Sequence, residues 1–291
     1  MKNTVLSTPP HHSNLSLAYW LSGLLAVITL VHAAVGAFWP GVFRDPPMTA
    51  GNAQGTAIVM LTIALPVLII SIILSARGSR RARLVWLGAL SYLLYNAVIF
   101  SFAVAFNPLF LLYVASLSLS FWSILVLLIR LDVEELRGRF DERLPARGFA
   151  VYVLAASGMF FVLWVGQIVP ALFASTRPAF LAGTDLLTSP VHVLDLGFAL
   201  PISVLGAAWL WRRKGWGFLL TGLMLSMLVI ETASIALDQW FGHLHDPAAS
   251  PAAVPLFVVL TVVGLVVLVA YLRYLRPLPE QGAGDSGRRI K

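Results

Sequence analysis

Eight long apolar stretches, separated by short polar segments, make up most of the chain. A helix of about 20 apolar residues crosses the roughly 30 Å hydrocarbon core of a bilayer. Each stretch reaches about this length, so the pattern predicts an all-α integral membrane protein with eight transmembrane helices. The predicted helices cover residues 16–39, 56–76, 84–104, 109–129, 149–174, 191–214, 216–237 and 254–271.

One charged stretch, residues 130–148, interrupts this pattern between the fourth and fifth predicted helices. Its apolar residues recur at nearly helical spacing, so we expect a short amphipathic helix on the membrane surface that ends at Pro145. These apolar residues are Val133, Leu136, Phe140 and Leu144. The polar chain ends predict a disordered leader and a disordered tail. The resulting units are a leader (1–15), a first half (16–129), a linker (130–148), a second half (149–275) and a tail (276–291).

The two predicted halves share short motifs in the same order. Ala64-Leu65-Pro66 in the second helix recurs as Ala199-Leu200-Pro201 in the sixth, and a basic cluster begins at the same distance after each proline. Pro108-Leu109-Phe110 before the fourth helix recurs as Pro255-Leu256-Phe257 before the eighth. These matches predict a parallel 4+4 repeat, in which both halves have the same orientation in the membrane. Chance similarity between apolar helices is the alternative.

Composition limits the chemistry that the chain can perform. Hydrophobic residues form 59% of the chain and charged residues 11%, against about a quarter charged in soluble domains. The chain has no cysteine, which excludes disulfides, thiolate metal ligands, iron–sulfur clusters and a cysteine nucleophile. It also contains no phosphate-binding loop, dinucleotide fingerprint or serine-hydrolase motif.

The net charge of +7 is gathered in a few clusters. With the N-terminus inside, 18 of the 20 lysine and arginine residues lie on the cytoplasmic side, and only Arg44 and Arg177 lie outside. This asymmetry follows the positive-inside rule and predicts that both termini are cytoplasmic. Topology and contact with anionic headgroups explain the charge, so no nucleic-acid partner is expected.

Five polar residues lie inside predicted helices, where an unpaired charge is costly. Counting from the outer helix ends places all five at a similar depth in the outer half of the membrane. They are His32, Asn96, Gln167, Asp195 and Glu231. One interpretation is an outward-facing polar cavity in which Asp195 and Glu231 carry protons or cations. The other is a structural network of hydrogen bonds between helices.

A metal or haem site is a second hypothesis for the same region. Four histidines offer imidazole ligands on the outer side, namely His32, His192 and the loop pair His243 and His245. His32 and His192 together could hold a haem between helices. The spacing of these residues matches no zinc signature, and the sequence identifies no cofactor.

Three runs of residues resemble a family of uncharacterised bacterial multi-pass membrane proteins. They are Tyr92-Leu-Leu-Tyr-Asn96, Phe106-Asn-Pro-Leu-Phe-Leu-Leu-Tyr113 and Pro190-Val-His-Val-Leu-Asp195. The resemblance covers most of the chain. It implies a location in the bacterial inner membrane and implies no activity.

The sequence therefore predicts a polytopic inner-membrane protein in contact with the lipid bilayer. The favoured activity is transport of a small solute, an ion or a proton through the polar layer. A metal- or haem-binding membrane enzyme and an accessory or sensory subunit are the alternatives, so enzymatic activity is left open. The sequence predicts no particular oligomeric state.

Overall fold

A computed structural model describes residues 15–276, and within that range the chain is helical apart from loops and one isolated β-bridge. Eight segments are long and apolar enough to cross a membrane, which confirms the predicted fold class. The predicted leader and tail lie outside the described residues, except for Leu15 and Arg276 at their edges.

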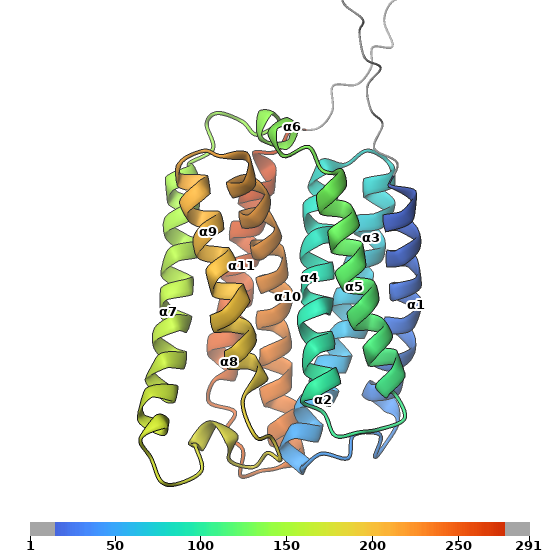
Figure 1. Ribbon diagram of the computed structural model, residues 1–291, viewed down its shortest axis with the longest axis vertical. Helices are drawn as coiled ribbons and strands as arrows, with labels where there is room; N and C mark the ends of the chain where they lie inside the picture. The colour runs from blue at the N-terminus through green and yellow to red at the C-terminus, as the bar shows by residue number, and fades with distance from the viewer. Residues whose placement is uncertain (1–14, 277–291) are drawn as a thin grey trace, which may run out of the picture.

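Six of the eight segments are single helices, labelled in chain order (Figure 1). They are α1 (Ser16–Phe38), α4 (Arg80–Phe102), α5 (Phe110–Arg130), α7 (Ala146–Leu172), α10 (Gly215–His245) and α11 (Val254–Arg273). The second segment consists of α2 (Pro47–Val59), η1 (Met60–Ala64) and α3 (Leu65–Ala76). The sixth consists of α8 (Pro190–Leu194), η3 (Asp195–Ala199) and α9 (Leu200–Trp211). Two short helices lie outside these segments, α6 (Val133–Gly138) and η2 (Ala179–Leu181).

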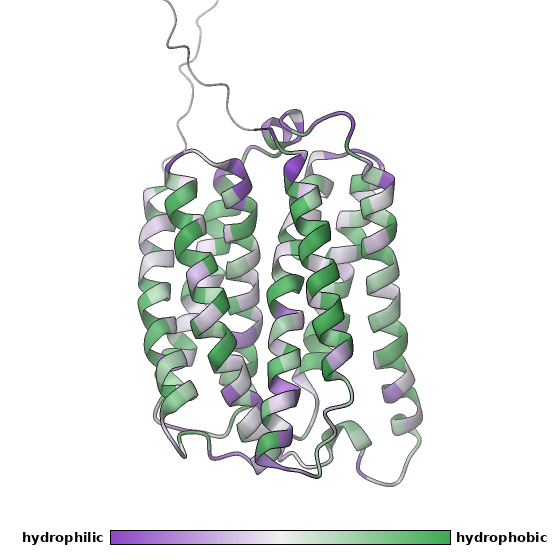
Figure 2. Ribbon diagram, turned by 180° about the vertical axis from the view of Figure 1, so that it is seen from behind, coloured by the Kyte–Doolittle hydropathy of each residue, from purple (hydrophilic) through white to green (hydrophobic). Residues whose placement is uncertain are grey.

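Hydrophobic residues predominate along the middle of the helices, and hydrophilic residues gather at the two ends of the bundle (Figure 2). Several large apolar side chains point outward, among them Trp20 at 79%, Leu111 at 76% and Val162 at 70% exposure. An apolar surface of this extent is stable only against lipid or a partner. The chain is therefore a polytopic membrane protein.

Helices α4 and α10 form the centre of the bundle. In the most apolar window of each, 67% of residues are buried, against 44% or less in the other six segments. α4 packs against α3 and α5, α10 packs against α2, α9 and α11, and the two central helices pack against each other (Figure 1). Side chains on these two helices therefore face the interior of the protein.

Two transmembrane segments contain a π-helical turn at the same place in the sequence motif. η1 ends at Ala64 and η3 ends at Ala199, and in each case Leu-Pro follows directly. Proline has no N–H for the helical hydrogen bond and its ring pushes against the preceding turn, so the helix widens there. The two turns agree with the motif match between the halves, and the 4+4 repeat itself stays a prediction.

Two helices are longer than the apolar pattern predicts. The second segment begins at Pro47 instead of 56, and α10 continues to His245 instead of ending at 237. The loop position predicted for His243 and His245 is therefore wrong. Polar residues at these ends are stabilised by specific partners: His245 Nε2 lies 2.8 Å from Gln54 Oε1, and His243 Nδ1 lies 2.7 Å from the Ala249 carbonyl oxygen.

Between α5 and α7, the linker forms a helix only at α6, so the predicted helix end at Pro145 is wrong, and the rest of the linker is irregular. Asp132 caps α6 by accepting a hydrogen bond from the Glu135 N–H at 2.9 Å, but this helix stops at Gly138. Phe140 then pairs with Leu275 in an isolated antiparallel bridge. The predicted apolar positions Leu136, Phe140 and Leu144 are buried. Contacts with the rest of the protein, rather than helical periodicity, hold this segment.

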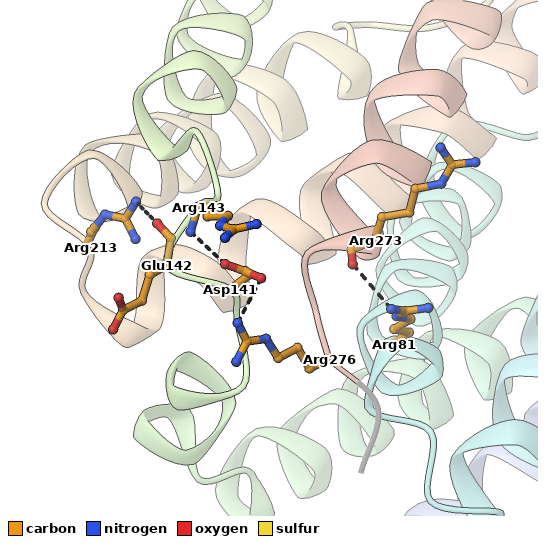
Figure 3. Close-up of polar contacts among 7 residues, drawn as sticks. All are labelled: Arg81, Asp141, Glu142, Arg143, Arg213, Arg273 and Arg276. Carbon is orange, nitrogen blue, oxygen red and sulfur yellow. Dashed lines mark hydrogen bonds and ion pairs between the residues drawn. The ribbon is translucent and has the colours of Figure 1, made fainter. Parts of the chain in front are cut away.

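The linker joins the two halves at one end of the bundle. We call this end, formed by α6, the α3–α4 and α9–α10 turns and the end of α11, the linker face (Figure 1). Arg81 Nε donates to the Leu275 carbonyl oxygen at 2.7 Å. Figure 3 shows a second bond from Arg81, to the Arg273 carbonyl oxygen, and the pair between Arg276 and Asp141 at 2.9 Å. The Arg143 N–H and the Arg276 guanidinium both bind Asp141, and this lowers the pKa of its carboxyl. Arg80, at the start of α4, pairs with Glu135 in the same way.

At the opposite end, α2 and α10 approach each other closely at glycines. A Cβ atom added to Gly55 would lie 2.7 Å from the Leu237 carbonyl group, and one added to Gly51 would clash with the Phe241 carbonyl oxygen. Small residues four apart allow helix backbones to come this near in a membrane. Backbone packing therefore connects the first half to the second at this end.

Candidate functional site

Polar side chains meet between the central helices, and α4 supplies donors on two neighbouring faces. Tyr95 donates from its hydroxyl to Asp195 Oδ1 at 3.0 Å, and Asn96 donates from Nδ2 to Glu231 Oε2 at 3.0 Å. Consecutive helical residues point about 100° apart, so these two neighbours reach different elements. Asp195 lies in η3 and Glu231 lies in α10. α4 thus links both predicted carboxylates.

Glu231 is held by one neutral donor. Asn96 is 3% exposed, and its Nδ2 also donates to the Tyr92 carbonyl oxygen at 3.2 Å, which fixes the amide in place. Of the two carboxylate oxygens of Glu231, only Oε2 accepts a hydrogen bond from residues 15–276. The side chain is partly exposed. One carboxylate oxygen of Glu231 is therefore free for a proton or a cation.

Asp195 is held more fully. Trp164 Nε1 on α7 donates to Oδ2 at 2.8 Å, and the Tyr95 hydroxyl donates to Oδ1. Asp195 is also the first residue of the π-helical turn η3. π-helical turns inside α-helices occur often at functional sites. The widened turn places the carboxyl group between α7 and α4.

A third interior carboxylate, Asp238, was not among the predicted site residues. It accepts a hydrogen bond from Thr56 Oγ1 at 2.7 Å. Asp238 follows Glu231 by two helical turns on α10, which places both on one face about 10 Å apart. The apolar stretch ends at Leu237, so Asp238 was assigned to a loop. Its spacing of seven from Glu231 was the signal that could have identified it.

His32 and Gln167, the other two predicted members, do not join this cluster. His32 is 3% exposed and lies in the first half with its ring 5.6 Å from Tyr113 and 6.3 Å from Phe100. Its Nε2 has no hydrogen-bond partner within residues 15–276. Gln167 on α7 is partly exposed, and its side chain makes no hydrogen bond to the described residues. The structure therefore brings Asn96, Asp195 and Glu231 together through α4.

The four histidines proposed as metal ligands have different surroundings. His192 packs between the rings of Trp164 and Phe180, each with a centroid distance of 4.7 Å, whereas His32 contacts Phe100 and Tyr113. Within residues 15–276, no group of three or more histidine, aspartate or glutamate side chains is arranged to hold a metal ion. The arrangement of the described residues gives the metal and haem hypotheses no support.

Among residues 15–276, none of the three interior carboxylates has a basic partner. All ion pairs among residues 15–276 lie on the linker face, and they join Arg80 or Arg139 to Glu135, Arg137 to Glu134, and Arg276 to Asp141. A carboxylate away from water is costly unless it is protonated or binds a cation. Neutral donors alone hold Glu231, Asp195 and Asp238. This arrangement favours reversible binding of protons or small cations.

Comparisons with known proteins add no further information on the site. No protein-family model, no curated protein and no solved structure matches the chain. The family resemblance inferred from the sequence therefore stays a prediction.

Proposed function

We propose that the protein is a transporter-like membrane protein that moves protons or a small cation by way of Glu231, Asp195 and Asp238. The observation that carries this proposal is the set of three interior carboxylates on α10 and η3 that only neutral donors hold. Glu231 is the central carrier, because α4 links it to Asp195 and it lies two helical turns from Asp238 on α10. Asp195 and Asp238 would exchange the same ion with Glu231.

The proposed orientation places the linker face in the cytoplasm of a bacterial cell, with both termini on that side of the inner membrane. The excess of arginine and lysine near this face supports the orientation. The polar layer then lies toward the outer side, where it would receive a proton or cation from outside the cell.

The proposed 4+4 duplication supports a central position for Glu231. Asn96 and Glu231 are 135 residues apart, and the same separation relates Ala64 to Ala199 and Met60 to Asp195. Two residues at equivalent positions contact each other only near a twofold axis. The Asn96–Glu231 hydrogen bond is consistent with a pseudo-twofold axis along the membrane normal, and it supports a position for Glu231 between the halves.

Proton flux into proteoliposomes tests the proposal. Vesicles containing the protein and a pH-sensitive dye receive an imposed membrane potential, and we expect faster acidification than in empty vesicles. Glu231→Gln keeps a hydrogen-bond acceptor but cannot ionise, so we expect its flux to fall to the level of empty vesicles. Asp185→Asn is the matched control, because Asp185 is an exposed loop carboxylate, and we expect it to behave as the wild type.

Two results would overturn the proposal. One is a wild-type flux equal to that of empty vesicles for protons and also for Na⁺ and K⁺. The other is a flux that Glu231→Gln leaves unchanged while the variant is folded, as judged by a single symmetric peak in size-exclusion chromatography.

A further inference from the structure

A cavity of about 580 Å³ lies on the linker face, at the cytoplasmic end of α10 in the proposed orientation. Small-molecule sites in proteins have volumes of about 300–1,000 Å³. α6, the linker loop and the α9–α10 turn form its walls. Its lining includes Glu134, Arg137, Phe140, Glu142, Arg213 and Phe218. It is separate from the carboxylate cluster and does not depend on the proposed transport function.

The lining combines an apolar floor with equal numbers of positive and negative side chains. Phe140 and Phe218 are almost fully buried, and their ring centroids are 4.8 Å apart. Gly138, two arginines and two glutamates make up the rest of the lining, in which Arg137 and Glu134 form an ion pair at 3.3 Å. A site that is neutral overall but carries both charges is complementary to a zwitterion, in which an anion and a cation lie a few ångströms apart.

Arg213 is held in an unfavourable backbone conformation. Its φ is 53°, and it is the only non-glycine residue with a positive φ in the described range, 15–276. Glycine, Gly78 with φ 92°, occupies the turn that follows the matching helix α3 in the first half. A side chain in this region of the Ramachandran plot costs about 1 kcal/mol or more, and such strain is concentrated at functional sites. The strain indicates that the side chain of Arg213 has a use there.

The guanidinium group of Arg213 has donors to spare. Nη2 donates to the carbonyl oxygen of Glu142 at 2.9 Å (Figure 3). It also donates to the carbonyl oxygen of Leu144 at 2.8 Å, and the two bonds fix the group against the linker. Nε and Nη1 bind no other group among the described residues. Both two-donor edges of a guanidinium group include Nη2, whose N–H groups are occupied here, so Nη1 and Nε each offer single N–H donors to a phosphate oxygen.

Neighbouring residues place the cavity at the level of lipid headgroups. Trp211 and Trp216, on either side of the α9–α10 turn, are 45% and 44% exposed. Tryptophan collects at the membrane–water interface because its ring is apolar and its N–H is polar. The Arg147 guanidinium lies 5.8 Å from the Trp211 ring centroid, a cation–π contact that holds this ring at the interface.

We propose that this cavity binds the phosphoethanolamine headgroup of a bilayer phospholipid. Arg213 and Arg137 bind the phosphate, and Glu134 and Glu142 accept hydrogen bonds from the primary ammonium. Choline has no N–H to donate, and glycerol headgroups carry no positive charge. The pairing of charges therefore selects ethanolamine over choline and glycerol phospholipids.

Native mass spectrometry of protein released from nanodiscs tests this proposal. The nanodiscs contain equal parts of phosphatidylethanolamine, phosphatidylcholine and phosphatidylglycerol, and we expect the wild type to retain phosphatidylethanolamine preferentially. Arg213→Gly removes the phosphate ligand and suits the positive φ, so we expect it to fold and to lose this preference. Glu142→Gln keeps the backbone carbonyl that binds Arg213, and we expect it to reduce the discrimination against phosphatidylcholine. Arg212→Gln, which removes the adjacent charge, is the matched control and is expected to retain the lipid as the wild type does.

Three outcomes would overturn the proposal. Retention of phosphatidylglycerol as strong as that of phosphatidylethanolamine would show that only anionic charge is read. Unchanged retention by Arg213→Gly would exclude Arg213 as the ligand. Thermal stabilisation by soluble phosphoethanolamine, together with no retained lipid, would show that the ligand is a soluble molecule and not a lipid.

Discussion

Replacing Gly55 by alanine tests whether the close approach of α2 and α10 supports the fold. A Cβ atom at this position would lie 2.7 Å from the Leu237 carbonyl carbon and oxygen and 2.8 Å from the Asp238 nitrogen. All three are backbone atoms of a long helix, so none of them can move unless α10 shifts. The shift would also lengthen the 2.7 Å hydrogen bond from Thr56 to Asp238.

The expected magnitude follows from three contributions. Alanine gains about 1 kcal/mol over glycine in a helix interior. Overpacking costs about 1–3 kcal/mol, at the upper end here because backbone atoms clash. Weakening a hydrogen bond to a carboxylate costs about 1.5–3 kcal/mol. The net destabilisation is about 3.5–5 kcal/mol, which for a chain of this size lowers the unfolding temperature by about 7–20 °C.

Thermal unfolding in detergent, followed by intrinsic tryptophan fluorescence, measures this effect. Gly158→Ala on α7 is the matched control, since a Cβ atom added there meets no atom within 4 Å. We expect that variant to unfold at the wild-type temperature or slightly above it. If Gly55→Ala and Gly158→Ala unfold at the same temperature, the glycine contact does not hold the two halves together.

Two further predictions concern carboxylates outside the membrane-spanning segments. Burial raises the pKa of Asp45, although the Ala105 N–H donates to its Oδ1 at 2.9 Å; the stability that this group contributes is therefore complete below the ordinary aspartate pKa and is lost as the pH rises through the folded value. We expect Asp45→Asn to unfold at a higher temperature than the wild type at neutral pH and at the same temperature near pH 4, and parallel pH profiles of the two proteins would refute this. Asp141 has the opposite sign, because its lowered pKa means that its contribution is present above the ordinary aspartate pKa and is lost as the pH falls. Asp141→Asn should lower the hydrogen-exchange protection factors of residues 139–144 at neutral pH, as acid does in the wild type, and unchanged protection factors would show that the pair with Arg276 does not hold the linker.

The sequence was sufficient for the number and order of the transmembrane helices, because about 20 apolar residues have few alternatives to a membrane span. It was insufficient for their ends. α10 continues past Leu237 because Asp238 and His245 find partners in Thr56 and Gln54, on a helix far away in the sequence. A hydropathy scale scores each polar residue on its own. It therefore cannot predict a hydrogen-bond partner that only the tertiary structure brings near.

The sequence predicted the depth of the candidate site residues in the membrane, but not the direction in which their side chains point. Counting residues along each helix placed His32 beside Asn96 and Glu231, whereas the rotation of α1 turns His32 toward Phe100 and Tyr113. Rotation depends on packing, and α1 carries small and large residues on several faces. The contact of Asn96 with Glu231 was not predictable beyond their shared depth, because the packing of α4 against α10 is a property of the assembled bundle.

The two ends of the bundle differ in the kind of contact that joins the two halves. At the linker face, the halves are joined by arginine side chains that bind carbonyl and carboxylate oxygens, and water can replace each of these bonds at little cost. At the other end, glycine backbones are in direct contact, and separating them would expose peptide groups that water or lipid must then cover. Gly88 also brings α4 close to the backbone of α10 nearer the linker face. At the linker face, water can therefore replace the polar bonds, but the helix contacts beside them have no such substitute.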